Sequence, residues 1–400
     1  MMSARVCALD MQLLREIPPY YIVIGDCERF RISIIIPLLE IRIYRKQCFT
    51  TLTLSTEEIV THQPLSSHPS QVAIVGIGGA GNNLLSQAID GGCSPRNCVA
   101  VNTDRGQLSE SRAKNKVLLA DSPETSSQLS RQRGAQGQLL AYRVAPFTQE
   151  SDFTILLAGL GGATGTLAAP LIAQWHRNQV RPVVSVVALP FIHERERRFV
   201  ALRGLKKMVE SCDCTVIVDN SIQKPALLNS ERVADETAAL AVRNLSEVVV
   251  TSSQMISQHI LNILSLGAVA TVCIAPVESR ERVQSAVVDA LTMPSASIPL
   301  SMARGAVLLF RGIEPLNNGQ TAQAYEAIAS LVGHDVDFVH VSTKCQAKSS
   351  LSIFLSGYTY DMALGTVEDL IEDLYDMEYG LESKPTRVAV RMPLYEMELA

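Results

Sequence analysis

The stretch VAIVGIGGAGNNLLSQAI, residues 72–89, determines how this chain folds. Its first four residues form an apolar run typical of a buried strand. Gly76, Gly78 and Gly81 follow as a GxGxxG turn before a helical pattern begins. Glycine lets backbone N–H groups approach a phosphate, and the start of a helix favours its negative charge. Asp104 follows about twenty residues later, where dinucleotide-binding folds carry a ribose-binding acid. The stretch therefore predicts a strand–turn–helix unit that holds phosphate.

A second glycine turn repeats this arrangement. Phe153 to Ala158 is typical of a buried strand, and GLGGATGT follows at residues 159–166, with two threonine hydroxyls at another helix start. A dinucleotide needs one phosphate cradle, whereas two cradles suit a longer polyphosphate. The sequence contains no Gly-Lys dipeptide and so no P-loop lysine. These features favour a nucleoside triphosphate held by glycine turns and helix dipoles, and they leave an NAD-dependent oxidoreductase of the Rossmann type as the alternative.

Strands alternate with helical segments along most of the chain, which predicts an α/β fold built on a parallel sheet. Ligands in such sheets bind at the carboxyl ends of the strands, where both glycine turns lie. The predicted parts are an N-terminal extension of unknown function (1–69), a Rossmann-like nucleotide-binding domain (70–228), a long connecting helix (229–250), a second, smaller C-terminal α/β domain (251–360), and an acidic amphipathic helix and tail (361–400). For the tail, docking on the C-terminal domain is the plainer interpretation and partner binding the alternative.

Composition limits the class of protein. Of 400 residues, 47% are hydrophobic and 19% charged, which is enough apolar material for a sizeable core. The formal net charge is −5, without the basic excess of a nucleic-acid binder. Nine cysteines, an odd number without zinc-site spacing, indicate reduced thiols. We expect a cytoplasmic protein with no nucleic-acid partner, no membrane insertion and no metal site of its own.

The ordered series of motifs resembles the tubulin/FtsZ superfamily, and most closely the prokaryotic cell-division GTPase FtsZ. The resemblance extends over about residues 71 to 357. Residues 78–82 (GGAGN) match the family's first phosphate loop, and residues 100–104 (AVNTD) match its following strand and turn. Residues 158–170 (AGLGGATGTLAAP) resemble its signature AGxGGGTGTGAAP, and residues 190–198 (PFIHERERR) resemble its ribose-side segment.

This resemblance implies a site for GTP or GDP, with Mg²⁺ as a possible companion of the phosphates. The implied nucleotide-binding residues of the two glycine turns and the strand end between them are Gly78, Gly79, Ala80, Gly81, Asn82, Asp104, Gly161, Gly162, Ala163, Thr164, Gly165 and Thr166. Glu194 and Arg198 stand at the positions expected to contact sugar and phosphate. Asn220 and Asp235 stand at the guanine positions, with Glu236 as the alternative to Asp235 if the register shifts by one residue.

The sequence departs from the family pattern in the second glycine turn and in the catalytic loop. Ala163 and Leu167 replace glycines of the signature, and Leu167 is expected to crowd the phosphate or its magnesium ion. In the family, hydrolysis needs an NxDxxD loop whose carboxylates reach the nucleotide of the next subunit. The stretch from 248 to 277 contains no Asp or Glu. The best candidates for the replaced positions are Ser253, Met255 and Gln258.

The resemblance therefore implies an FtsZ-like nucleotide-binding protein that assembles head to tail with itself or modulates filaments of an intact FtsZ-like subunit. Without the carboxylates, weak or absent hydrolysis is expected from the chain alone. A structural homologue that has lost nucleotide binding is a further alternative, for which Leu167 is the motive.

Overall fold

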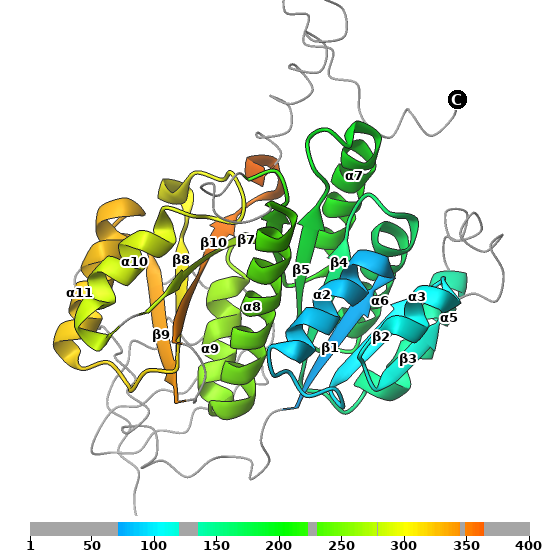
Figure 1. Cartoon of the computed structure of the whole chain (residues 1–400), viewed down its shortest axis with the longest axis horizontal. Coiled ribbons are helices and arrows are strands. Elements are labelled where there is room, and N and C mark those ends of the chain that lie inside the picture. The colour runs from blue at the N-terminus through cyan, green and yellow to red at the C-terminus, as the bar shows by residue number, and fades with distance from the viewer. Residues whose placement is uncertain (1–70, 120–134, 223–229, 278, 345–348, 364–400) are drawn as a thin grey trace, which may run out of the picture. The chain divides into compact units, whose positions relative to one another are not determined.

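The computed structural model describes residues 71–119, 135–222, 230–277, 279–344 and 349–363 (Figure 1). All of these belong to one structural unit, Thr53–Ala400. The predicted N-terminal extension (1–69) lies outside the described residues, and so does the predicted tail (361–400) apart from residues 361–363.

Six parallel strands form the first part of the sheet, in the order β3-β2-β1-β4-β5-β6. Strands β1 and β4 pair from Val72↔Phe153 to Ile77↔Ala158, so they end side by side. The inner strands are buried on both faces, because helices cover a parallel sheet on both sides. The strand bounds are β1 Val72–Ile77, β2 Cys98–Asn102, β3 Asn115–Leu118, β4 Phe153–Gly159, β5 Val183–Leu189 and β6 Cys214–Asp219.

The strands predicted after the long helix continue the same ten-stranded sheet, in the order β7-β10-β8-β9. Strand β7 joins the two parts, because it pairs in parallel with β6 from Thr215↔Val269 to Ile217↔Thr271. Strand β10 is antiparallel to both β7 and β8, and β8 is parallel to β9. The fold is thus α/β with a mostly parallel sheet, while the predicted domain boundaries stay a prediction. The bounds are β7 Val269–Pro276, β8 Gly305–Arg311, β9 Asp337–Thr343 and β10 Ser350–Tyr358.

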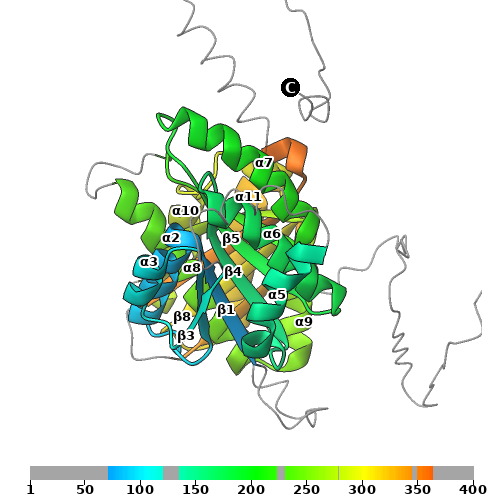
Figure 2. The ribbon, with the colours of Figure 1, turned by 90° about the vertical axis from the view of Figure 1, so that its right-hand side faces the viewer.

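Helices cover both faces of the sheet (Figures 1 and 2), and an apolar core lies on each face. Helices α2, α3, α8 and α9 contribute to one core, and α5, α6, α7, α10 and α11 contribute to the other. Each helix turns a stripe of apolar residues toward the sheet, as amphipathic helices do. The helix bounds are α2 Gly78–Asp90, α3 Arg105–Glu110, α5 Ala135–Thr148, α6 Ala163–Asn178, α7 Arg195–Ser211, α8 Ser230–Thr251, α9 Gln254–Leu264, α10 Val283–Leu291 and α11 Asn318–Leu331, with short 3-10 helices η2 Arg280–Arg282 and η3 Leu300–Met302.

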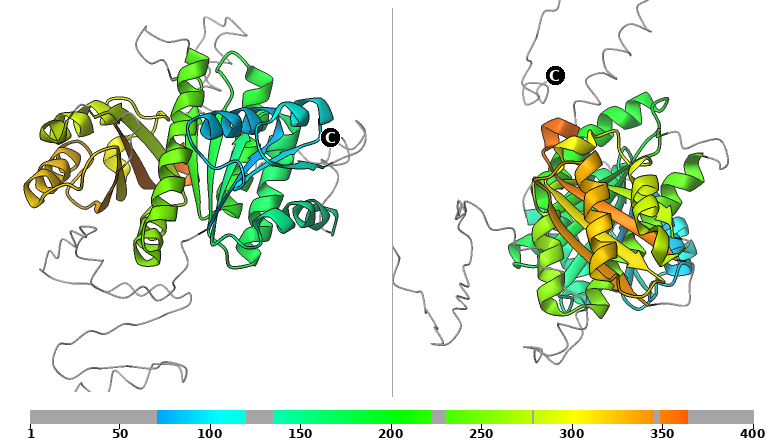
Figure 3. Two further views of the ribbon diagram at one scale, coloured as in Figure 1. Left: turned by 60° about the horizontal axis from the view of Figure 1, so that its bottom comes forward. Right: turned by 90° about the vertical axis from the view of Figure 1, so that its left-hand side faces the viewer.

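Helix α8 is the long connecting helix that the sequence predicts, and it lies over one face of the sheet where the two parts join (Figure 3). It packs against α2 and against strands of both parts. Its 22 residues span about 33 Å, so its last turn lies far from the carboxyl end of β6. In the part of the chain that the structure describes, no helix is both long enough and apolar enough to cross a membrane.

His176 on α6 is fully buried between α6 and α5. Its Nε2 lies 3.2 Å from the hydroxyl oxygen of Thr148, and its Nδ1 has no hydrogen-bond partner among the described residues. Burial, with a smaller contribution from the charge of Arg181, lowers the pKa of His176 to about 4. The folded protein therefore holds this imidazole neutral.

We expect the stability of the fold to decrease in mild acid because of His176. The unfolded chain binds a proton at this side chain near pH 6.5, whereas the folded protein does so only near pH 4. The free energy of unfolding should therefore fall as the pH drops from 6.5 to 4, by roughly 3 kcal/mol for this group. Urea unfolding at pH 7 and pH 5 measures the loss. His176→Gln should flatten the dependence and the exposed-site control His334→Gln should not; equal slopes in both variants would contradict the assignment.

Candidate functional site

Both glycine turns lie at the carboxyl edge of the sheet, on neighbouring strands. Because β1 and β4 end in register, the helices that follow them, α2 and α6, begin side by side. Gly78 and Gly161 have φ angles of 75° and 92°, a left-handed conformation that glycine adopts without strain. The hydroxyls of Thr103 and Thr164 lie 2.7 Å apart and join the end of β2 to the start of α6. The sequence therefore brings two helix N-termini to one point.

A cleft of about 470 Å³ opens at this edge. It is lined by the ends of β1, β2, β4, β5 and β6 and by the helix starts after them. Of the residues predicted for the site, those that line it are Gly78, Gly79, Ala80, Asp104, Gly162, Ala163, Thr164, Gly165, Glu194 and Asn220. Its lining also includes Asn83, Asn102, Thr103, Gln107 and Arg197, which the sequence analysis did not assign to the site. Thr103 lies inside the quoted strand motif, and Gln107 follows three residues after Asp104, so spacing alone could have suggested both.

The glycines of the two turns serve two different purposes. A Cβ atom on Gly81 would lie 2.4 Å from the carbonyl oxygen of Leu157, and one on Gly165 would lie 2.3 Å from that of Gly159. These two glycines let α2 and α6 pack directly on strand β4. A Cβ atom on Gly162 would instead meet nothing within 4 Å, because this residue faces the open cleft.

Four of the predicted phosphate-binding residues lie behind the cleft surface rather than on it. They support the turns: the backbone N–H of Gly161 donates to the hydroxyl of Thr166 (2.9 Å), and Asn82 donates through its side-chain nitrogen to the carbonyl oxygen of Val101 (3.2 Å). The residues absent from the cleft lining are Gly81, Asn82, Gly161 and Thr166.

Arg198 does not reach the cleft, contrary to its predicted placement there. It is buried beneath the cleft, where its guanidinium makes a bidentate pair with Asp219 (2.9 and 2.5 Å) and also donates to the carbonyl oxygen of Pro190. The neighbouring Arg197 lines the cleft and donates to Glu194 at 2.7 Å. Burial acts to raise the pKa of Glu194, but the hydrogen bonds from Arg197 and from the backbone of Phe191 outweigh it, so the pKa lies below its ordinary value.

Asn220 marks the far end of the cleft from the glycine turns. It follows β6 directly, and its side-chain oxygen is buried without a hydrogen-bond partner among the described residues. A buried amide oxygen without a partner is costly, so this atom calls for a donor from a ligand or from water.

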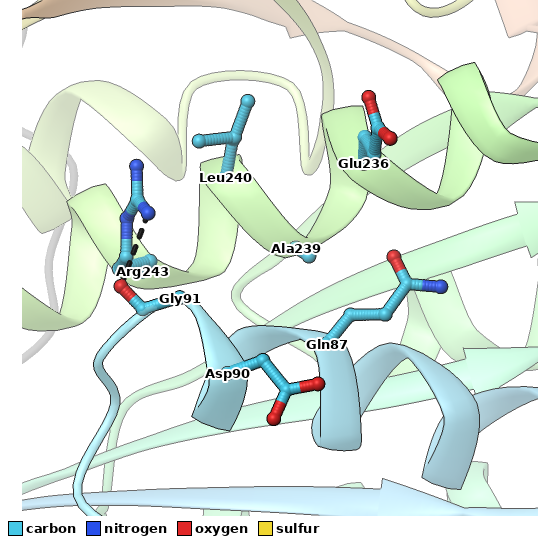
Figure 4. A pocket seen from close by; sticks show the side chains of 7 residues that line it. All are labelled: Gln87, Asp90, Gly91, Glu236, Ala239, Leu240 and Arg243. Atoms are coloured by element: carbon cyan, nitrogen blue, oxygen red, sulfur yellow. Dashed lines mark hydrogen bonds between the residues drawn. The ribbon is translucent and has the colours of Figure 1, made fainter. Parts of the chain in front are cut away.

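The predicted second base contact, Asp235, is not among the residues that line this cleft. Its Oδ2 accepts a hydrogen bond from Gln87 of α2 (3.3 Å). Glu236, the alternative position, lines a separate shallow hollow between α2 and α8 with Gln87, Asp90 and Arg243 (Figure 4). The chain between 222 and 230 lies outside the described residues, so the sequence assignment of the base contacts stays a prediction.

The two substitutions in the second glycine turn leave the cleft open. Ala163 is the first residue of α6 and lines the cleft, where its methyl group replaces a hydrogen atom. Leu167 is half-buried and packs against the core that α6 shares with α7, and it is not part of the cleft lining. The expected crowding of the phosphate by Leu167 is therefore not what the structure shows.

The segment expected to replace the catalytic loop lies at the turn from α8 to α9. Ser253 is the N-cap of α9, and its hydroxyl accepts from the backbone N–H of Ile256 (3.4 Å). Met255 is 70% exposed, and Gln258 donates to the side chain of Asn262 on the same helix. None of these side chains is a carboxylate. No group of three or more metal-ligating side chains is found within the described ranges of the chain.

Comparisons with known proteins agree with this geometry. Residues 71–229 match the family model described as the Tubulin/FtsZ family, GTPase domain. The chain is 29% identical over 300 residues to cell division protein FtsZ 1 of Methanocaldococcus jannaschii, which covers 70% of this chain and 80% of that protein. It is 30% identical over 263 residues to FtsZ 1 of Pyrococcus furiosus, covering 61% of this chain and 69% of that protein. Its fold matches the GTPγS-bound protofilament of CetZ2 from Haloferax volcanii with a TM-score of 0.62 at 20% identity, over 76% of this chain and 99% of that one.

We expect the two kinds of glycine to differ in their effect on stability. Gly165→Ala forces a Cβ atom against the backbone of Gly159, so the free energy of unfolding should fall by about 1–3 kcal/mol or more. Gly162→Ala adds its methyl group to open space at the start of α6, and the change should stay below about 1 kcal/mol. Urea unfolding of both variants provides the comparison. Equal decreases in the free energy of unfolding of the two variants would show that the close contact at Gly165 does not restrict the side chain at this position.

Proposed function

The chain belongs to the tubulin/FtsZ family, and from this premise we propose that it binds GTP and GDP in the cleft and works as an FtsZ-like cytoskeletal protein. The observation that carries the proposal is the pair of helix N-termini that meet at one cleft. Two helix starts supply converging N–H groups and two positive dipole ends, which suits a polyphosphate. The family and the sequence motifs supply the identity of the nucleotide as GTP.

In this proposal the phosphates lie between the two glycine turns. Gly79 and Gly162 would admit the phosphates close to the backbone, and Thr164 would offer a hydroxyl. Gly81, Gly165 and Thr166 act indirectly, because their contacts hold the turns in place. Magnesium would enter with the nucleotide, bound mainly through its phosphates.

The sugar and base would extend from the glycine turns toward β6. Glu194 and Arg197 line the middle of the cleft, so we propose that they, and not Arg198, face the ribose side. Asn220 would satisfy its buried side-chain oxygen with a donor of the guanine ring. Asp235 keeps its proposed role as the second guanine contact, and a nucleotide would compete there with the hydrogen bond from Gln87.

Two other functions fit the site less well. An NAD-dependent oxidoreductase needs one phosphate cradle and a free ribose-binding acid, whereas Asp104 caps α3 and accepts from the backbone N–H of Gln107 (3.1 Å). In a homologue that no longer binds nucleotide, side chains would be expected to fill the cleft. Leu167, the residue that suggested such a loss, packs away from the cleft.

Assembly follows from the family relationship and stays part of the proposal. CetZ2 from Haloferax volcanii has been solved as a protofilament, which supports head-to-tail association of this fold with itself or with an intact FtsZ-like subunit. The nucleotide cleft and the turn from α8 to α9 lie at the two ends of the long helix α8. A neighbouring subunit that docked this turn over the cleft would bring Ser253, Met255 and Gln258 to the nucleotide. It would bring no carboxylate to position the attacking water.

We predict that Gly162→Val abolishes GTP binding while the protein stays folded. The Cβ atom of the valine would meet no protein atom within 4 Å, and the side chain would start in the cleft, so the loss would come from the blocked anion site. Equilibrium binding of labelled GTP, with ATP and NAD as competitors, measures affinity and specificity together. Gly319→Val, at the start of α11, is the matched control for the substitution itself. Unchanged GTP affinity in Gly162→Val, or preference for NAD in the unaltered protein, would overturn the proposal.

We predict that the protein alone releases phosphate from GTP very slowly at every concentration. The missing water-positioning carboxylates should cost on the order of 10²–10⁴ in rate. Met255→Asp/Gln258→Asp restores two carboxylates at the spacing of the family loop, and it should raise turnover as the concentration increases. Met302→Asp on η3 controls for an added surface acid. Fast, concentration-dependent release by the unaltered protein would show that another residue replaces the acids.

A further inference from the structure

Helix α7 presents an exposed stripe that is both apolar and basic. Phe199, Val200, Arg203, Lys206 and Lys207 repeat at helical spacing along its outer side, and all five are exposed. Phe199 and Val200 are 45% and 42% exposed, and they begin the stripe two residues after Arg197 of the cleft. We name these five residues the α7 stripe.

The three cations of the α7 stripe lack partners within the part of the chain that the structure describes. Arg203, Lys206 and Lys207 make no hydrogen bond and no ion pair there. By contrast, Arg197 and Arg198 at the start of the same helix are paired with Glu194 and Asp219. Glu196 and Glu210 are exposed on the same side at its two ends. The sites that can receive carboxylates are therefore the three unpaired cations between them, next to two exposed apolar side chains, and this arrangement suits an acidic amphipathic segment as the occupant.

The last described residues of the chain contact this helix. After β10, residues 360–363 form a short helical segment near α7 (Figure 2). Tyr360 donates its hydroxyl to the carbonyl oxygen of Leu202 on α7 at 3.2 Å. Tyr360 and Met362 also pack against the apolar core on this face of the sheet, to which α7 contributes. Burial, with the nearby charges of Asp361 and Glu210, raises the pKa of Tyr360 to about 12, so this hydroxyl keeps its proton and its hydrogen bond at neutral pH. Tyr360 thus anchors the start of the tail on α7.

The sequence that follows is the chemical complement of the α7 stripe. Residues 364–379, LGTVEDLIEDLYDMEY, contain six acidic residues and no Lys or Arg. Val367, Leu370, Ile371 and Leu374 recur at helical spacing, which predicts an amphipathic helix. Sixteen helical residues would span about 24 Å, against about 25 Å for the 17 residues of α7.

We propose that residues 364–379 bind the α7 stripe of the same chain, with their apolar side on Phe199 and Val200 and their carboxylates against Arg203, Lys206 and Lys207. The anchor at Tyr360 makes this association intramolecular, so a weak interface can still be well occupied. The bound tail would lie beside the nucleotide cleft and not on the second half of the sheet. This inference does not depend on which nucleotide the cleft binds.

Amide hydrogen exchange of the full-length protein tests the proposal. In the unaltered protein at 0.1 M salt, residues 364–379 should exchange at least about tenfold more slowly than an unstructured chain. Lys206→Glu/Lys207→Glu should remove this protection. Adding Glu372→Lys/Asp373→Lys to that variant should restore it, because the charges on α7 and on the tail then attract each other again with opposite signs. Protection should weaken in 1 M salt, because the exposed charges are then screened.

A matched control separates this site from a general effect of charge. Lys114→Glu/Lys116→Glu reverses two exposed lysines near the β3 edge of the sheet and should leave the tail protected. An unprotected tail in the unaltered protein would overturn the proposal, and so would protection that the α7 reversal does not change, since the tail would then dock elsewhere. Protection that grows with protein concentration would assign the α7 stripe to a second copy and would equally overturn it.

Discussion

The close approach of α2 and α6 to strand β4 is the constraint on which the rest of the structure depends. Gly81 and Gly165 leave no room for a side chain, because backbone carbonyl oxygens lie where their Cβ atoms would be. Their helices therefore begin directly at the strand ends, and the parallel register of β1 and β4 places the two beginnings side by side. The two helix starts at the cleft are a consequence of this backbone packing, and helix N-termini favour an anion before any charged side chain contributes.

A buried ion pair positions the other side of the cleft. The guanidinium of Arg198 donates two hydrogen bonds to the carboxylate of Asp219. Asp219 also accepts a hydrogen bond from the backbone N–H of Ser221 (2.8 Å). The pair ties the start of α7 to the end of β6, so Arg197 and Asn220 face the same space. Replacing either residue of a buried ion pair leaves the charge of the other residue uncompensated. Arg198 thus acts on the site through the geometry of its neighbours.

The sequence predicts local features of this protein well and long-range ones less well. The glycine turns and the strands that precede them are local patterns, and the structure has both where they were expected. The continuous sheet depends on three residue pairs between β6 and β7, which are separated by two helices, and no local pattern encodes such a pairing. Arg198 turns inward because it shares one side of α7 with the buried Ala201, Leu205 and Met208, and Asp219 pairs with it there, whereas Arg197 lines the cleft.

The cleft and the turn from α8 to α9 are built by different segments of the chain. Ser253 caps α9 through its hydroxyl, and Met255 projects into solvent, so neither the core nor the glycine turns require a carboxylate at the turn from α8 to α9. The resemblance implies that such carboxylates would act on the nucleotide of another subunit, and so would contribute to turnover and not to the stability of their own fold. Their loss therefore costs the chain no packing. The chain can therefore keep both glycine turns and the cleft between them without a carboxylate at the turn from α8 to α9.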